Sequence, residues 1–300
     1  MSAVNITSGE LKPQEVEMIF RLAVDAQTTS FMAVTFFALL VFDYFITLDK
    51  EVAVIWSNRR PSMARYIYII NRYFSLLVLG VCASVYLKHA NDDDLCQLYA
   101  RLRYASSTII IATVDFILML RVWVLFGKSR KLLFFIVPWI LIEIAAMILV
   151  GELTVQRDST YLHYDFIGGC YSLDGLPPYF SLFALPSLVL GFSMFCLTVW
   201  NCHAKLEISF SQILDHDVKR SWMPIATLFF RDGVYWFVAV VAVNPVQMLL
   251  WQVAPITLSQ VLMVPSMVVY SIIGSRVLLN MMDLLNAEVV SVPRYSGGDF

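Results

Sequence analysis

The sequence predicts an all-α integral membrane protein, a bundle of seven transmembrane helices. Hydrophobic residues make up 59% of the 300 residues and charged residues 15%, well outside the usual range for a soluble domain. The mean hydropathy of +0.71 agrees with this prediction. A net charge of −2 and the lack of a long basic segment give no sign of a nucleic-acid partner. The predicted partner is the lipid bilayer, and we expect a multi-pass protein of the plasma membrane.

Seven apolar runs carry this prediction, each near the length of about 20 residues that crosses roughly 30 Å of hydrocarbon. They are 30–48, 65–87, 104–126, 132–150, 178–200, 222–243 and 254–273. The predicted domains are an extracellular segment 1–29, a transmembrane domain 30–274 and a cytoplasmic tail 275–300. In the tail, an apolar face on 275–288 indicates either a short amphipathic helix along the inner leaflet or an extension of the last span.

The basic residues of the short loops predict the orientation, because such residues favour the cytoplasm. The first, third and fifth loops hold Lys50, Arg59, Arg60, Lys128, Arg130, Lys131, Lys205, Lys219 and Arg220. The other loops hold Lys88, Arg101, Arg103 and Arg157, and they also hold the acidic run 92–94. Arg101 and Arg103 run against the bias. We expect the N-terminus outside, where Asn5 of Asn5-Ile6-Thr7 could be glycosylated, and the C-terminus in the cytoplasm.

Two of the five cysteines lie in predicted outer loops, namely Cys96 and Cys170. An oxidising compartment permits a disulfide between them. The sequence therefore predicts a bridge from the beginning of the third span to the loop after the fourth, the alternative being two unpaired thiols.

Two charges lie inside the first two predicted spans, Asp43 and Arg72. Since an α-helix rises about 1.5 Å per residue, they lie roughly 8 and 10 Å from the shared membrane face. A lone charge at mid-membrane costs about 3 kcal/mol, and a partner on the next helix reduces that cost. We therefore expect an ion pair between Asp43 and Arg72 that fixes the packing of these two helices.

Further ionisable residues fall near the centres of later spans and complete a predicted buried charge layer with Asp43 and Arg72. They are Asp115, Glu143, Arg231 and Asp232. Charges at such depths usually face a bundle interior or an aqueous cavity. The layer is interpreted either as ion pairs that hold helices together or as a ligand, ion or proton site.

A distinctive set of residues flanks the first loop: Asp43, Tyr44, Thr47, Glu51, Val52, Trp56 and Asn71-Arg72-Tyr73. This set resembles the N-terminal signature of a fungal, basidiomycete-type membrane family catalogued as a domain of unknown function, number six-five-three-three. The segments 120–123, 231–237 and 275–280 are similar to further features of that family. The resemblance implies a multi-pass membrane protein and a topology, but it implies no reaction.

Catalytic patterns are missing, so we expect no enzyme, no cofactor and no metal site. The four histidines lie near loops without metal-ligand spacing, and there is no glycine-rich phosphate loop. The predicted layout is similar to that of seven-helix G-protein-coupled receptors, with Arg121 near the cytoplasmic end of the third span. Residues 265–270 do not reproduce the receptor motif of the last span, and Arg121 lacks a preceding acid.

Function is therefore predicted at the level of class. A receptor or sensor with a possible small-molecule ligand and a possible cytoplasmic signalling partner is the first hypothesis. A small transporter or channel of the three-plus-one-plus-three kind is the alternative, although its expected internal repeat is faint. A non-catalytic membrane scaffold is the third.

Overall fold

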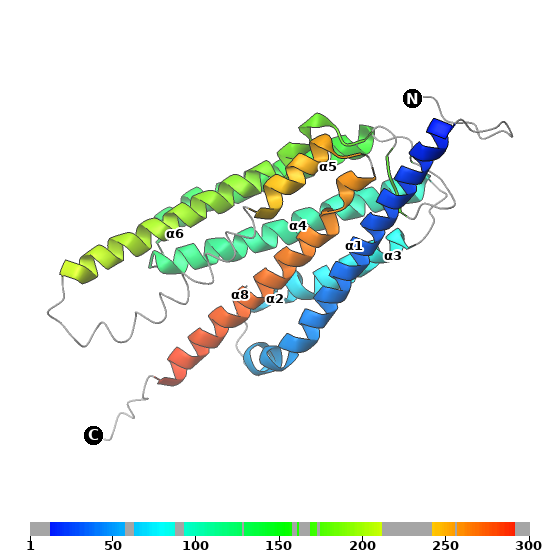
Figure 1. Cartoon of the computed structure of the whole chain (residues 1–300). Helices are drawn as coiled ribbons and strands as arrows, with labels where there is room; N and C mark the ends of the chain where they lie inside the picture. Colours follow the sequence, from blue (N-terminus) through cyan, green and yellow to red (C-terminus); the bar gives the residue numbers. More distant parts are fainter. Residues whose placement is uncertain are drawn as a thin grey trace, which may run out of the picture.

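The computed structural model describes residues 13–57, 63–87, 93–127, 129–157, 161, 169–172, 175–211, 242–255 and 257–291. These residues form a bundle of long helices (Figure 1). Among the described residues, Tyr161 and Ser172 form an isolated antiparallel β-bridge, and no strand is present. The all-α prediction is confirmed.

The helices follow one another in a simple order along the chain. They are α1 (Pro13–Glu51), η1 (Val52–Trp56), α2 (Met63–Ile69), η2 (Ile70–Phe74), α3 (Ser75–Tyr86), α4 (Asp93–Leu125), α5 (Arg130–Arg157), η3 (Pro178–Phe183), α6 (Leu185–Ser211), the helical residues 242–253, η4 (Leu258–Gln260) and α8 (Met263–Ser291). Both η1 and η2 are π-helical turns, whereas η3 and η4 are 3-10 turns. After α4, Gly127 takes the left-handed conformation (φ 64°) that commonly ends a helix.

Six helical segments of the described chain are long and apolar enough to cross a membrane: Val16–Trp56, Met63–Tyr86, Asp93–Leu125, Arg130–Arg157, Pro178–Asn201 and Met263–Asp283. They overlap six of the predicted spans. Several helices extend well beyond the predicted ends, and the last one begins at Met263 and not at the predicted residue 254. The remaining predicted span, 222–243, lies almost entirely outside the described residues. The protein is thus a multi-pass helical membrane protein.

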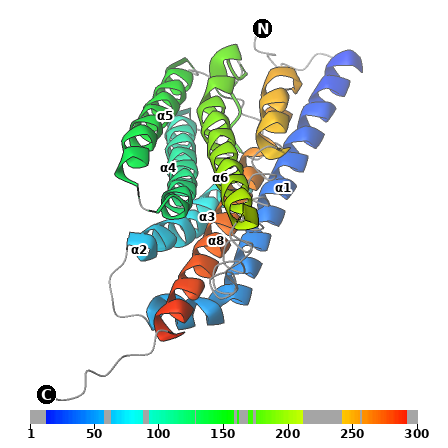
Figure 2. The ribbon, with the colours of Figure 1, turned by 90° about the vertical axis from the view of Figure 1, so that its left-hand side faces the viewer.

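The bundle has two ends that differ in chemistry. The disulfide end holds the beginning of α1 and the Cys96–Cys170 bridge, and the motif end holds η1 and the beginning of α2. Both α1 and α8 run from the disulfide end to the motif end, so these two helices are parallel (Figure 1). Figure 2 shows α4, α5 and α6 grouped on one side; α4 also contacts α8, which packs on α1.

Apolar side chains cover much of the outside of the bundle, as expected where lipid replaces water. On α5 the outward residues include Phe134, Phe135, Leu141, Ile142 and Leu149, each at least 60% exposed. A helix satisfies its own backbone hydrogen bonds, which is why helices can present such a face to hydrocarbon. The exposure pattern agrees with a bilayer around the bundle.

The last helix is longer than the sequence predicted. The helix α8 continues without interruption through residues 274 and 275 to Ser291. Of the two interpretations of 275–288, the extension of the last span is the one the structure has. The same helix passes close to its neighbours at Gly274, where an added Cβ would lie 3.0 Å from Asn71 Nδ2 and 3.2 Å from Val114 Cγ2.

This close approach predicts that Gly274→Ala lowers the free energy of unfolding by about 1–3 kcal/mol, because the new methyl group overpacks a tight contact. Gly80→Ala is the matched control: its Cβ would meet the far end of the partly buried Phe37 ring, which can move. Denaturation in detergent measures both variants. Equal effects of the two substitutions would contradict the tight packing of α8.

Candidate functional site

The carboxylate of Glu51 lies at the centre of a polar network at the motif end. It is fully buried at the end of α1 and accepts hydrogen bonds from Tyr73 Oη at 2.7 Å, Trp56 Nε1 at 3.0 Å and Tyr68 Oη at 3.0 Å. The fourth contact is an ion pair, with Arg72 Nε 2.9 Å from Oε2. Each carboxylate oxygen therefore has two partners, which is what a buried charge requires.

Arg72 is the cationic half of this network and is itself 3% exposed. Its Nη2 donates to the Thr47 hydroxyl at 2.6 Å and to the Tyr44 carbonyl at 2.8 Å. The guanidinium carbon also lies 4.8 Å from the centre of the Tyr44 ring, within cation–π range. Arg72 thus joins the second membrane-spanning segment to α1, and its partners Tyr44, Thr47 and Glu51 span more than one turn of α1.

Each charge of the pair lies at a π-helical turn. Glu51 immediately precedes η1, and Arg72 is the central residue of η2. A π turn inserts one extra residue into a helix and rotates the following side chains, and such turns are frequent at functional sites. Because of these turns, Trp56 reaches back to the carboxylate five residues before it, and both Arg72 and Tyr73 face α1.

A second set of polar contacts fastens α8 to this network. Arg276 binds Asp43 Oδ1 through Nη2 at 2.7 Å and Nε at 2.8 Å. Further along, Lys50 lies 3.1 Å from Asp283 and donates to Asn280 at 2.9 Å. We call the network around Glu51 and Arg72, together with these α8 contacts, the motif-end network.

The buried Asn71 adds a contact deeper in the bundle. Its side chain donates to the Ser271 carbonyl at 2.9 Å and to the Ser275 hydroxyl at 3.1 Å, and the Ser271 hydroxyl donates back to the Asn71 carbonyl at 3.0 Å. These bonds hold η2 against α8. The consecutive residues Asn71 and Arg72 therefore bind two different helices.

The predicted ion pair between Asp43 and Arg72 is wrong in its partners. Both residues are buried on neighbouring helices as expected, but Asp43 pairs with Arg276 and Arg72 pairs with Glu51. The depth of each residue along its helix can be estimated from the sequence, but depth does not fix the direction in which a side chain points. Glu51 was overlooked as a partner because it follows the apolar run and was assigned to the loop.

Asp115 and Glu143 lie buried on α4 and α5, two helices that pack against each other. The Ser187 hydroxyl of α6 donates to Asp115 Oδ2 at 2.8 Å. Asp115 therefore binds a serine of α6, and in the described part of the chain neither acid is paired with Asp43 or Arg72. The other two members of the predicted layer, Arg231 and Asp232, lie outside the described residues.

Of two further predicted residues, the structure describes Arg121 but not Asn5. Arg121 is buried on α4, four residues before the helix ends. Asn5, the predicted glycosylation site, lies outside the described residues. In the part of the chain that the structure covers, no three His, Cys, Asp or Glu side chains gather as metal ligands.

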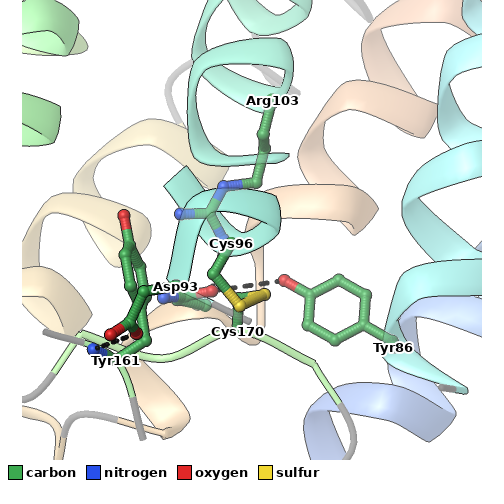
Figure 3. Close-up of a disulfide and its surroundings, with 7 residues drawn as sticks. Tyr86, Asp93, Cys96, Arg103, Tyr161 and Cys170 are labelled. Carbon is green, nitrogen blue, oxygen red and sulfur yellow. Dashed lines mark hydrogen bonds between the residues drawn. A yellow bond between two sulfur atoms is a disulfide. The ribbon is translucent and has the colours of Figure 1, made fainter. Parts of the chain in front are cut away.

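The predicted disulfide is confirmed at the opposite end of the bundle. Cys96 in the first turn of α4 is bonded to Cys170 in the segment after α5, and Asp93 accepts a hydrogen bond from the Tyr161 backbone beside it (Figure 3). The disulfide anchors this segment over α4.

Arg103 lies on α4 beneath that segment and is 3% exposed (Figure 3). Its assignment to an outer loop was wrong, because α4 begins at Asp93 and contains it. Its guanidinium donates to Gln260 and, at 3.3 Å, to the Tyr104 hydroxyl. Gln260 also accepts from Tyr86 at 3.4 Å, so it links α3 and α4 to the residues that lead into α8.

The fold and the polar networks define an α-helical multi-pass membrane protein. Residues 31–77 match a family model described as "Family of unknown function (DUF6533)". The match contains both halves of the Glu51–Arg72 pair and all residues that bind them. Searches of the curated proteins and of the solved structures found no match.

The geometry predicts strong coupling between Glu51 and Arg72. Glu51→Gln or Arg72→Gln alone leaves one buried charge unpaired, which costs about 3–5 kcal/mol of stability. The double variant removes both charges, so its loss should be smaller than the sum by about 1–3 kcal/mol. Denaturation of the four proteins in detergent gives this coupling energy.

Asp43→Asn combined with Arg72→Gln is the matched control for that cycle. These two side chains have different ion-pair partners and are linked only through Thr47, so their coupling should be clearly smaller than that between Glu51 and Arg72. Coupling in this control and additivity for Glu51 with Arg72 would reverse the assignment of partners.

Proposed function

We propose that the protein is a seven-helix receptor or sensor of the plasma membrane, with its N-terminus outside and its C-terminus in the cytoplasm. We also propose that it acts by changing shape and not as an enzyme. The fungal origin implied by the resemblance stays a prediction.

The supporting observation is the run of contacts along α8, a single helix of 29 residues. Just before it begins, Gln260 binds Arg103 at the disulfide end. In its middle, Ser271 and Ser275 bind Asn71. Further toward the motif end, Arg276 binds Asp43. A rigid element that touches both ends can carry a displacement from one to the other, which is the physical requirement for a sensor.

The direction of the chain supports a seventh span. α6 runs toward the motif end, whereas α8 begins at the disulfide end (Figure 1). The chain therefore has to return across the bundle between α6 and α8. The helical residues 242–253 already lie at the disulfide end, where Trp251 packs against Phe180 with ring centres 4.6 Å apart. We infer that the apolar run 222–243 makes the crossing.

The charges support an inward motif end. Lys50, Arg130 and Lys131 lie at or near helix ends there, and Asp93 and Asp94 begin α4 at the disulfide end. Arg103 no longer counts against the rule for cytoplasmic loops, because it is buried inside a helix. A disulfide also suits an outer, oxidising compartment. These features agree with the proposed orientation.

Spin-label distance measurements in nanodiscs test whether the two ends are coupled. One label pair reports the motif end, at position 287 of α8 and at the exposed Phe134 of α5; a second reports the disulfide end, at the exposed Val16 and Leu98. Free cysteines are first replaced by serine. Gln260→Ala then removes the contact between Arg103 and the residues that lead into α8.

If the protein is a sensor, Gln260→Ala should add a second population to the motif-end distances. Couplings between sites are typically about 1–3 kcal/mol, which is enough to populate a second conformation. Gln252→Ala is the matched control: this exposed glutamine binds the Pro178 carbonyl at the same end, outside α8. An unchanged motif-end distribution in Gln260→Ala favours the scaffold. A third result favours the transporter: the wild type already shows two populations at each end, and one end opens when the other closes.

A further inference from the structure

The guanidinium of Arg103 borders a small cavity at the disulfide end, and we propose that this cavity binds a monovalent anion of about the size of chloride. The cavity measures about 10 Å³ and lies between α4, the segment around Cys170 and Gln260. The proposal does not depend on whether the protein is a receptor.

The charge of Arg103 is the first reason. Its hydrogen-bond partners are the neutral groups of Gln260 and Tyr104, and the rings of Tyr99 and Tyr104 lie 5.6 and 5.1 Å from its guanidinium carbon. Among the described residues, no carboxylate forms an ion pair with it. Buried cations are normally paired with anions, so the site requires a negative charge.

Unused hydrogen-bond donors are the second reason. Arg103 Nε is buried and donates to no group of the described chain, and the same holds for the Ser172 hydroxyl on the opposite segment. Both residues line the cavity. The Arg103 guanidinium, with its unused Nε donor, and the Ser172 hydroxyl border one space and form an environment for an anion. A metal cation would find no carboxylate among the lining residues.

The size of the cavity sets the class of ligand. A cavity of about 10 Å³ is roughly the space of one water molecule. Among anions, a single halide ion is nearest to that size, whereas phosphates and organic acids are much larger. The competing occupant is a single water molecule, which would leave the positive charge of Arg103 uncompensated.

The test measures the melting temperature of the full chain in detergent, with tryptophan fluorescence as the readout. Sodium gluconate is replaced stepwise by sodium chloride or sodium bromide at constant ionic strength. An anion that binds the folded state raises the melting temperature with a saturable dependence on its concentration, by roughly 2–4 °C. Arg103→Gln should abolish this response. Arg101→Gln, the exposed arginine two residues earlier on α4, should retain it in full.

Two results of this test would overturn the proposal. One is an equal melting temperature in chloride and gluconate for the wild type, as expected for a bound water. Another is a halide response that survives in Arg103→Gln.

A second variant keeps the proposal testable if Arg103→Gln fails to fold. Ser172→Ala removes one donor but leaves the charge in place, and it should weaken the halide response about threefold to tenfold. A full-strength response in Ser172→Ala, with half-saturation at the wild-type concentration, would exclude the cavity as the binding place.

Discussion

A buried ion pair, Glu51 with Arg72, is the constraint on which the motif end depends. Two charges withdrawn from water are stable only if their remaining hydrogen-bonding groups are satisfied. Here the carboxylate accepts hydrogen bonds from Tyr68, Tyr73 and Trp56, and the guanidinium donates to two oxygen atoms of α1. The geometry needs both π turns, because a regular helix would rotate these side chains away. The region that matches the family model is therefore a single cooperative polar network.

The last helix, α8, contacts the motif-end network and is preceded by a residue that contacts the disulfide end. Asn71, next to Arg72, binds α8 near its middle, and Asp43 and Lys50 of α1 bind it toward its end. At the other end, Gln260 precedes the helix and meets Arg103. Polar contacts of this kind are directional and few, so a change at one of them has a defined consequence for helix position.

Sequence reasoning predicted the features that depend on composition. Long apolar runs located six of the described helices, and the two outer cysteines identified the disulfide. It failed where side-chain direction mattered. Asp43 and Arg72 lie at suitable depths, but depth alone could not show that a π turn directs Arg72 toward Glu51. Arg103 was assigned to a loop because the apolar run begins at the next residue, and hydropathy cannot distinguish an exposed arginine from one buried behind its neighbours.

The most direct measurement of the central pair is the infrared difference spectrum between the wild type and Glu51→Gln in lipid. It shows whether the side chain that is lost was an ionised carboxylate or a protonated carboxyl group. We expect the loss of a carboxylate band, since the charge of Glu51 balances that of Arg72. The loss of a protonated carboxyl band would show that Glu51 is neutral, and the ion pair at the motif end would be contradicted.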